Sequence, residues 1–196
     1  MEQNQRIEFT QRGLLITAQQ YDPLVVGPMT VTGRWTFVTS NQHGDLLDVI
    51  TRTDASNLSW VGFPQSGNSF QYNDNNAGPT ININRVGVGS FTNLASAPIN
   101  FLPGEVFDFT ITDAGTNLTC SVVQVGGAGK SASISGTDST NFSTDYLIFT
   151  NSRNSGDYVA YLDDVQISSA PVPEPTSVFV WSILGMTCIG GAARTE

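Results

Sequence analysis

Apolar and polar residues alternate at every second position along much of this chain, and this period constrains the fold more than any other feature. From Met29 to Phe37, Met, Val, Trp and Phe stand at odd positions, while Thr and Arg stand at even positions. A period of two is typical of a β-strand with one buried face. The same alternation in Phe107–Thr112 and in Leu118–Val122, joined by the turn Asp113–Thr116, predicts a β-hairpin.

About ten to twelve short strands, separated by turn residues, are expected before the C-terminal tail, and none of this region keeps a helical period. Such a series predicts an all-β fold: an antiparallel β-sandwich, with a jelly roll of two packed sheets as the leading architecture. Residues 6–19 are expected to form a first strand pair or a short helix. Residues 93–103 are expected to form a loop with one short strand near Ile99–Leu102.

The charge balance excludes several classes of partner. The chain carries 17 acidic residues against 8 basic ones, for a formal net charge of −9, and Lys130 is its single lysine. A basic patch for nucleic-acid phosphates or anionic lipid headgroups is therefore not expected. Charged residues make up only 13% of the chain. Asn, Ser, Thr and Gly take their place, which is common in extracellular β-proteins and unfavourable for exposed helices.

The cysteine and histidine content argues against a disulfide and against a zinc site. Cys188 lies in the apolar tail, so a pair with Cys120 in the body is not expected. Cys120 is interpreted as a small buried hydrophobe on a strand. His43, the single histidine, stands in a polar turn beside Gly44 without a nucleophile motif nearby. It is interpreted as a solvated turn residue.

The C-terminal region differs from the body in composition and charge. Residues 171–175 form a proline-rich hinge, and residues 176–193 carry no charge. As a helix rising about 1.5 Å per residue, residues 176–193 would span about 27 Å, slightly less than a hydrocarbon core of about 30 Å. We therefore expect a β-sandwich domain in residues 1–170, the hinge, and a transmembrane or sorting helix in residues 176–196. The alternative is a buried C-terminal strand or helix of the globular domain.

The hinge carries the tetrapeptide Val172-Pro173-Glu174-Pro175, followed by the apolar segment and then by Arg194. This order resembles the PEP-CTERM sorting signal of bacterial exported proteins. The resemblance implies export to the cell envelope or extracellular space, and recognition by an exosortase-type membrane peptidase that removes or transfers the tail. It also implies a bacterium that makes extracellular polysaccharide. The family usually ends in a cluster of arginines, whereas Arg194 stands alone, which weakens a positive-inside anchor.

The N-terminus shows no signal peptide. It reads MEQNQRIEF, which has no cationic start followed by an apolar region. Two explanations are compatible with the export that the tail implies. Either the true start lies upstream of Met1, or the chain reaches the membrane through its tail alone.

The body resembles the concanavalin A-like or laminin-G-like jelly roll in its hairpin Phe107–Leu118 and in its last expected strand, which contains Leu162–Ile167. The resemblance implies carbohydrate binding for some members, although such folds serve many functions. The expected role is an exported, non-enzymatic surface or extracellular-matrix protein, with polysaccharide as the candidate ligand and the membrane as a partner of the tail.

A glycan-active enzyme of the jelly-roll type, a glycoside hydrolase or lyase, is the alternative. Such an enzyme needs two carboxylates at a suitable separation, and no Glu-x-Asp-x-x-Glu run is present. Asp163 and Asp164 are adjacent, and Asp45 and Asp48 differ in parity, so each pair is expected on opposite faces of a strand. No catalytic residue is therefore assigned, and no cofactor is required.

Exposed aromatic side chains are the first candidates for a ligand site, because they can stack on sugars. The candidates are Trp60, Phe63 and Tyr72. A core position is at least as strongly expected for Trp60.

Carboxylate and amide oxygens are the second candidates, because they can bind Ca²⁺. The densest group is the loop formed by Asn73, Asp74, Asn75 and Asn76. The alternative is a solvated polar loop, since no EF-hand spacing is present.

Overall fold

The computed structural model describes residues 7–10, 13–16, 28–39, 45–54, 65–74, 78–88, 90–127, 129–140, 146–152 and 159–169. The predicted hinge at residues 171–175 and the predicted helix at residues 176–196 lie outside these ranges. Within the described ranges, no helix is long and apolar enough to cross a membrane.

The described residues form twelve β-strands. They are β1 (Ile7–Thr10), β2 (Gly13–Ile16), β3 (Met29–Thr39), β4 (Asp45–Thr53), β5 (Gly67–Asp74), β6 (Thr80–Gly87), β7 (Ser90–Pro98), β8 (Val106–Ala114), β9 (Asn117–Gln124), β10 (Ser131–Thr137), β11 (Tyr146–Ser152) and β12 (Val159–Ser169).

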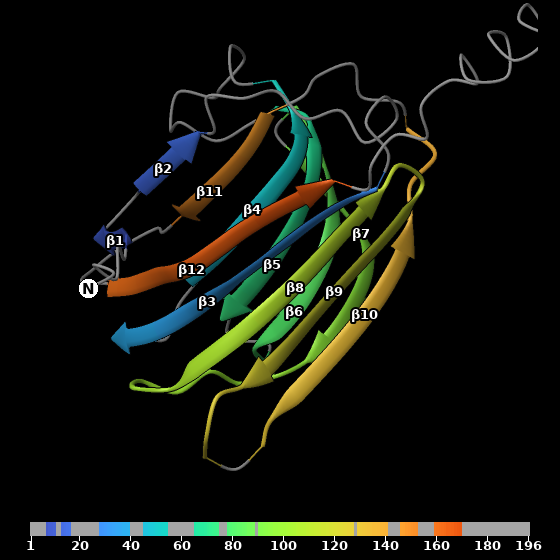
Figure 1. Ribbon diagram of the computed structural model, residues 1–196. Coiled ribbons are helices and arrows are strands. Elements are labelled where there is room, and N and C mark those ends of the chain that lie inside the picture. The colour runs from blue at the N-terminus through green and yellow to red at the C-terminus, as the bar shows by residue number, and fades with distance from the viewer. Residues whose placement is uncertain are drawn as a thin grey trace, which may run out of the picture.

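The strands lie in two packed six-stranded sheets in which every pair is antiparallel (Figure 1). Sheet A has the order β1-β12-β3-β8-β9-β10, and sheet B has the order β2-β11-β4-β5-β6-β7. Strands β4 to β7 form a meander in sheet B, and β8 to β10 form one in sheet A. This arrangement confirms the predicted antiparallel β-sandwich. Residues 6–19 hold two strands, β1 and β2, as expected, but the two are not paired with each other, because β1 pairs with β12 in sheet A and β2 pairs with β11 in sheet B.

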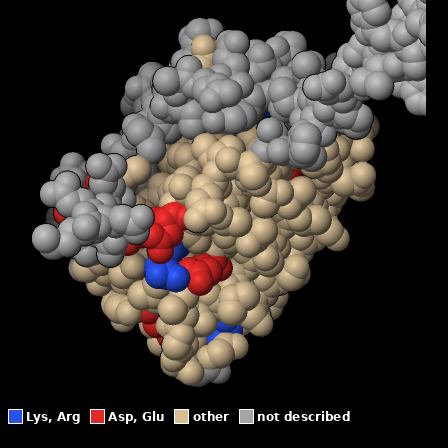
Figure 2. All heavy atoms as spheres, in the orientation of Figure 1, with Lys and Arg blue, Asp and Glu red and all other residues tan. Residues whose placement is uncertain are grey.

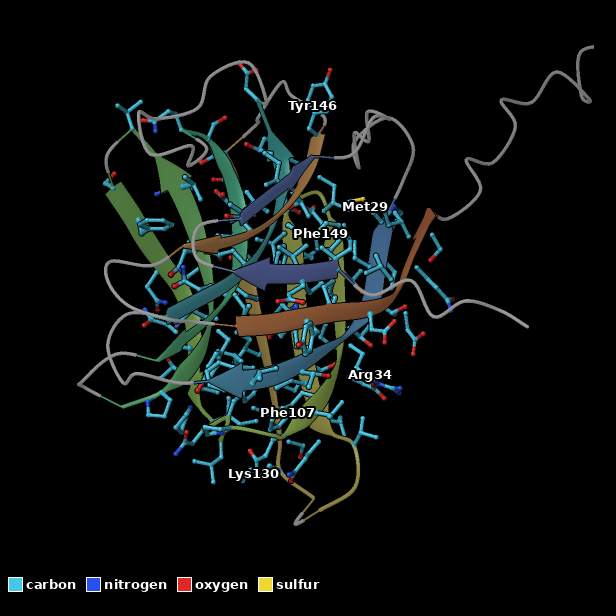
Figure 3. All side chains as sticks on the ribbon, turned by 90° about the vertical axis from the view of Figure 1, so that its left-hand side faces the viewer. Met29, Arg34, Phe107, Lys130, Tyr146 and Phe149 are labelled. Atoms are coloured by element: carbon cyan, nitrogen blue, oxygen red, sulfur yellow. The ribbon has the colours of Figure 1, made fainter. Side chains whose placement is uncertain are left out.

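The core lies between the two sheets and is built from the apolar parity of each strand. In β3, the side chains of Met29, Val31, Trp35 and Phe37 are buried, as the alternation predicts. Burying each large apolar side chain contributes about 1.5–3 kcal/mol. Arg34, on the other parity, projects outward from the sandwich (Figure 3).

Three stacked rings form the centre of the core. The centroid of Phe101 lies 3.9 Å from that of Tyr72 and 3.7 Å from that of Phe107. Phe37 and Tyr72 form an edge-to-face pair, with ring centroids 5.9 Å apart and an interplanar angle of 87°. Because Phe101 follows the end of β7, this stack ties the connection between β7 and β8 to both sheets.

Gly33 interrupts the apolar parity of β3 for a steric reason. A Cβ at this position would lie 2.5 Å from Cζ of Phe109 and 2.7 Å from its Cε1. Gly33 is the cross-strand partner of Phe109, so the phenyl ring occupies the space that a side chain would need. The missing apolar residue in the alternation is therefore supplied by the neighbouring strand.

The expected loop over residues 93–103, with a short strand near Ile99–Leu102, is wrong in the position of its strand. Residues Ser90–Pro98 form the edge strand of sheet B, and Ile99–Leu102 follows its end without strand structure. Most of β7 is exposed, and its register shifts opposite Ile83 and Asn84. An exposed edge with a bulge lacks a regular period of two, which is why the sequence pattern does not reveal this strand.

Candidate ligand-binding site

The face of sheet B that is turned away from sheet A carries rows of polar side chains. The register places these residues side by side across neighbouring strands. One row is Thr150, Asp48, Gln71, Asn82 and Ser96. The next row is polar only over β5 to β7, at Ser69, Asn84 and Asn93, and continues on β4 and β11 with the buried apolar side chains of Ile50 and Ile148. Neighbouring strands lie about 4.8 Å apart, so side chains within a row are in reach of one another.

Strand alternation explains why these amides share a face. In β6, Ile81 and Ile83 point into the core, so Asn82 and Asn84 point away from it. These two asparagines are nevertheless only 7% and 5% exposed. Burying an amide is favourable only when it is hydrogen-bonded. The side chains in these rows are hydrogen-bonded to one another, beginning at Asp48 and continuing across β5 and β6.

Asp48 is the acidic group of this face and is buried. Ser69 Oγ donates to its Oδ1 at 2.5 Å, and Gln71 Nε2 donates to its Oδ2 at 3.0 Å. Burial raises the pKa of Asp48 to about 7, although both hydrogen bonds act in the opposite direction. No cation among the described residues forms an ion pair with this carboxylate.

A chain of amide hydrogen bonds leads from Asp48 to the exposed edge of sheet B. Asn84 Nδ2 donates to Gln71 Oε1 at 3.4 Å, and Asn93 Nδ2 donates to Asn84 Oδ1 at 3.0 Å. Asn93 lies on the edge strand β7 and is exposed. We call Asp48, Gln71, Asn84 and Asn93 the amide relay. The buried carboxylate of Asp48 on β4 is thus linked to the exposed amide of Asn93 on β7 by three successive hydrogen bonds between neighbouring strands.

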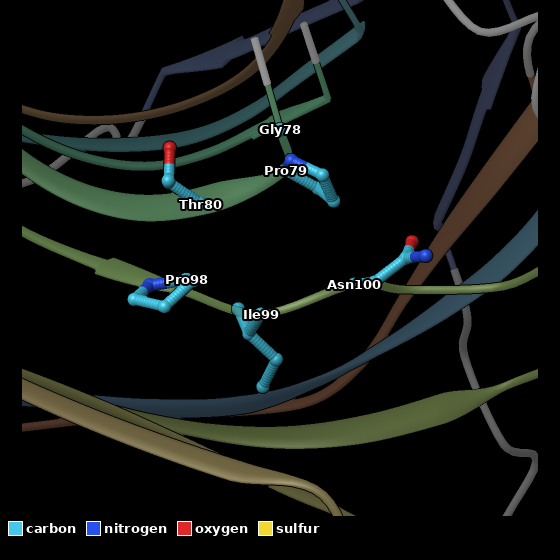
Figure 4. Close-up of a pocket in the computed structure, with 6 residues that line it drawn as sticks. All are labelled: Gly78, Pro79, Thr80, Pro98, Ile99 and Asn100. Atoms are coloured by element: carbon cyan, nitrogen blue, oxygen red, sulfur yellow. The ribbon is translucent and has the colours of Figure 1, made fainter. Parts of the chain in front are cut away.

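A hollow of about 370 Å³ lies at the adjacent ends of β6 and β7. Figure 4 shows that its lining comes from two strand ends, and the residues are Gly78, Pro79, Thr80, Pro98, Ile99 and Asn100. The backbone N–H of Ile99 donates to the carbonyl oxygen of Pro79 at 3.1 Å, which joins the two ends. Asn82 Nδ2 donates to Thr80 Oγ1 at 3.1 Å, so the polar row continues to the hollow.

Asn73 is the cross-strand partner of Thr80 and has one unmet acceptor. Its Nδ2 donates to Gln71 Oε1 at 3.4 Å. Its Oδ1 is buried and has no hydrogen-bond partner among the described residues. Such an oxygen in a folded protein calls for a hydrogen bond from water or a ligand, or for a cation to coordinate.

The calcium candidates are only partly covered by the described residues. Asn73 uses its amide on Gln71, Asp74 is the last residue of β5, and Asn75 and Asn76 lie outside the described ranges. Among the described residues, no group of three or more His, Cys, Asp or Glu side chains could hold a metal ion.

Tyr72 is a core residue, so the prediction that it stacks on a sugar is wrong. Its side chain is fully buried, and its ring stacks on Phe101 with an interplanar angle of 6°. Its hydroxyl oxygen accepts a hydrogen bond from the backbone N–H of Phe101 at 3.1 Å. Tyr72 shares the inward parity of Phe70 in β5, which explains its burial. Trp60 and Phe63 lie outside the described residues.

The expected positions of the paired aspartates need a correction. The register of β12 on β3 shifts between Asp163 and Gln166, and Asp164 has a φ of 52°. Leu162 packs into the core, and so does Val165 after the shift. This β-bulge therefore turns both Asp163 and Asp164 outward, instead of placing them on opposite faces.

The outer face of sheet A carries a charged group around Arg34. Arg34 Nε lies 2.7 Å from Asp108 Oδ1, and Arg34 Nη1 lies 3.3 Å from Asp164 Oδ2. Figure 2 shows acidic and basic side chains gathered together on this face among uncharged residues. The hydrogen bond from Arg34 to Asp108 raises the pKa of the guanidinium, so Arg34 stays charged and engages the carboxylates on this face.

The remaining sequence candidates fall into two groups. Cys120 is buried, as predicted, and burial raises the pKa of its thiol to about 12, so the thiol stays protonated. The other candidates lie outside the described residues, and they are His43, Cys188, Val172, Pro173, Glu174, Pro175 and Arg194.

The sequence interpretation missed the amide relay. Its signal is visible in β6, where Asn occupies both outward positions of Ile81–Asn84 instead of a charged residue. The pattern alone does not identify Asp48 and Asn93 as its ends, because strand register is needed to connect them.

Comparison with solved structures identifies the fold. Lectin UEA-II complexed with galactose matches with a TM-score of 0.62 and 16% identity, over 82% of this chain and 82% of that chain. The exoplasmic/lumenal domain of VIP36 in its Ca²⁺/Man3GlcNAc-bound form matches with a TM-score of 0.61 and 14% identity, over 87% and 78%. Carbohydrate-binding module CBM66 from Bacillus subtilis matches with a TM-score of 0.56 and 12% identity, over 81% and 83%.

These likenesses establish a lectin-like β-sandwich at low sequence identity. No protein-family model and no curated protein matches the sequence.

Proposed function

We propose that this chain binds carbohydrate along the β6–β7 edge, which runs from Asn93 to Thr80, Asn100 and the hollow at the strand ends. The observation that carries the proposal is the amide relay, which holds an exposed amide at the edge by means of a buried carboxylate. Solved lectins and a carbohydrate-binding module of the same fold support this choice of ligand class.

The chemistry of the edge suits a sugar ring. A sugar presents hydroxyl groups that donate and accept hydrogen bonds, together with an apolar C–H face. Pro79, Pro98 and Ile99 give the hollow apolar surface, while Thr80 and Asn100 add polar groups. A concave, mainly apolar site with a few placed polar groups is typical of small-ligand binding. The net charge of −9 favours a neutral glycan over an anionic one.

Binding of the full chain to immobilised galactose and to immobilised Man3GlcNAc tests the proposal. Asn93→Ala and Thr80→Val are expected to weaken binding by about fivefold to tenfold each, the effect of losing one hydrogen bond of about 1 kcal/mol or slightly more. Thr110→Ala is the matched control, because Thr110 is exposed on the outer face of sheet A. Equal binding by all three variants and the wild type would contradict the proposed site.

The proposed activity is binding without turnover, in an extracellular matrix or at a cell surface. A glycan-active enzyme remains the alternative, and release of reducing sugar from polysaccharide separates the two. Glycan binding without sugar release supports the binding role. Sugar release that disappears on substitution of one carboxylate would establish the enzyme instead.

We also propose that residues 171–196 form a separate sorting segment, with Val172–Pro175 read by an exosortase-type membrane peptidase and residues 176–196 held in the membrane before processing. The support is the resemblance to the PEP-CTERM signal. The intact mass of the protein from its native source tests this proposal. A mass that corresponds to a chain ending near Pro173–Pro175 supports the proposal. A mass that corresponds to a chain ending at Glu196, without any attached group, contradicts it.

Two further contacts remain proposals. Trp60 and Phe63 are proposed to stack on the ligand, and the loop residues Asn73, Asp74, Asn75 and Asn76 are proposed to offer oxygen ligands to Ca²⁺. Glycan binding measured with calcium and with a chelator tests the second proposal. Equal binding in the two conditions would contradict a role for the cation.

A further inference from the structure

The amide relay has a direction that follows from its buried end. An ionised carboxylate accepts hydrogen bonds and donates none. Gln71 therefore turns its Nε2 toward Asp48, at 3.0 Å from Oδ2, and its Oε1 toward the next strand. There Oε1 accepts from Asn84 Nδ2 at 3.4 Å and from Asn73 Nδ2 at 3.4 Å.

The same direction continues to the edge strand. Because Asn84 donates to Gln71, its Oδ1 faces Asn93 and accepts from Asn93 Nδ2 at 3.0 Å. Asn93 Nδ2 also donates to the carbonyl oxygen of Ala95 at 3.2 Å. Both amide protons of Asn93 thus have acceptors within the protein. The Oδ1 of this exposed side chain is the atom left to meet solvent or a ligand.

We propose that Asp48 is a positioning residue that holds Asn93 with its Oδ1 outward, so that the β6–β7 edge prefers ligands that donate hydrogen bonds. This inference rests on the proposed carbohydrate binding and specifies its chemistry. The preferred ligand contacts Asn93 through a free hydroxyl group, and an ether or other pure acceptor at that position is rejected. Rejection of this kind is effective because an acceptor facing another acceptor leaves both groups unpaired.

An amide at position 48 removes the requirement that Gln71 donate to residue 48. Asn can donate to Gln71 Oε1 as well as accept from Nε2, so Asp48→Asn allows the whole relay to reverse. After reversal, Asn93 would turn its Nδ2 outward and present a donor. The shape of the site changes little, because aspartate and asparagine are nearly isosteric.

Amide proton exchange in the unliganded wild-type protein tests the direction of the relay without any ligand. The side-chain NH₂ protons of Asn93 are expected to exchange at least tenfold more slowly than those of Asn117, an exposed asparagine at the start of β9. Exchange of Asn93 as fast as that of Asn117 would overturn the proposal.

Ligand preference tests the consequence for binding. The probes are galactose and its fully O-methylated derivative, which accepts hydrogen bonds and donates none, and the pH is 8 so that Asp48 is ionised. Wild type is expected to prefer galactose, and Asp48→Asn is expected to reduce that preference about fivefold to tenfold. Ser69→Ala removes the other hydrogen bond to Asp48 and keeps the relay, so it should preserve the preference of wild type.

The outcomes distinguish the positioning role of Asp48 from the proposed binding of carbohydrate. An unchanged preference in a folded Asp48→Asn protein overturns the positioning role, even if glycan binding is real. Binding of neither probe by wild type contradicts galactose as a ligand of the proposed site. In that case the exchange rates of the Asn93 side-chain NH₂ protons in wild type and in Asp48→Asn still decide whether Asp48 orients the relay, because reversal would turn these protons outward and speed their exchange.

Discussion

Arg52 Nε lies 3.1 Å from Asp113 Oδ2, and both side chains are buried between the sheets. Arg52 belongs to β4 in sheet B, and Asp113 belongs to β8 in sheet A, so an ion pair joins the two sheets inside the sandwich. Thr51 Oγ1 donates to the same carboxylate oxygen at 2.5 Å, and the N–H of Gly115 donates to Oδ1 at 3.0 Å.

A local change in the backbone makes this arrangement possible. Thr51 and Arg52 are consecutive, and a regular strand would place them on opposite faces. Arg52 has a φ of 52°, in the left-handed region that non-glycine residues rarely adopt. Both side chains can therefore reach Asp113. The strain is tolerated because the buried carboxylate holds both residues.

Asp113→Ala is expected to destabilise the protein by about 3–5 kcal/mol, because it removes the carboxylate that compensates the buried charge of Arg52. The measurement is the free energy of unfolding in urea. The control is Asp108→Ala, which breaks the exposed pair with Arg34 and should cost at most about 1 kcal/mol. Similar costs for the two variants would contradict a special role for the buried pair.

Stability is expected to fall as the pH rises from about 4 to about 7 because of Asp48. Burial raises the pKa of the Asp48 carboxyl to about 7 in the folded protein, from an ordinary value of 3.8. Between these values the native state holds a proton that the unfolded state has lost, so the stabilisation present below pH 4 is lost by pH 7. A difference of about 3 pKa units corresponds to about 4 kcal/mol, as an order of magnitude.

Urea unfolding of wild type and Asp48→Asn between pH 4 and pH 8 measures this dependence. The Asn variant has no proton to lose at position 48, so its stability should vary less over this window. Parallel curves for the two proteins would show that Asp48 does not titrate with a raised pKa.

Much of the sandwich could be predicted from the sequence, because alternation is a local property. The inward residues of β3 and β8 follow from it directly. Features that break the alternation were missed for the same reason. The bulge at Asp163 and Asp164 and the left-handed residue Arg52 occur without glycine, and an arginine inside a strand gives no sign of a left-handed backbone.

The amide relay depends on non-local register, which no local pattern contains. Asp48 and Gln71 are 23 positions apart, and their contact requires that β4 and β5 pair in one particular register. A shift of one residue would turn one of these side chains into the core. Tyr72 is a different case, since its shared parity with Phe70 is local and already indicates burial.

Tyr72→Phe distinguishes a core role for Tyr72 from a role in ligand binding. Loss of the hydroxyl leaves the N–H of Phe101 without its acceptor, and the expected cost is about 1–3 kcal/mol of stability. Glycan binding by the folded variant should equal that of wild type, since the ring is fully buried. Loss of binding with unchanged stability would contradict the core role.

Gly33→Ala tests the close approach of β3 and β8. The added methyl group would overlap the ring of Phe109, whose Cζ lies 2.5 Å from the Cβ position. Overpacking of this kind is expected to cost about 1–3 kcal/mol. Phe109→Leu removes the overlapping atoms, so the cost of Gly33→Ala should be clearly smaller in a Phe109→Leu background. Urea unfolding of the wild type, both single variants and the double variant gives this coupling. If the free-energy costs of the two substitutions simply add, the overlap with Phe109 is not the reason that position 33 excludes a side chain. Another contact, such as that with the carbonyl oxygen of Asp163 at 3.4 Å, would then be the reason.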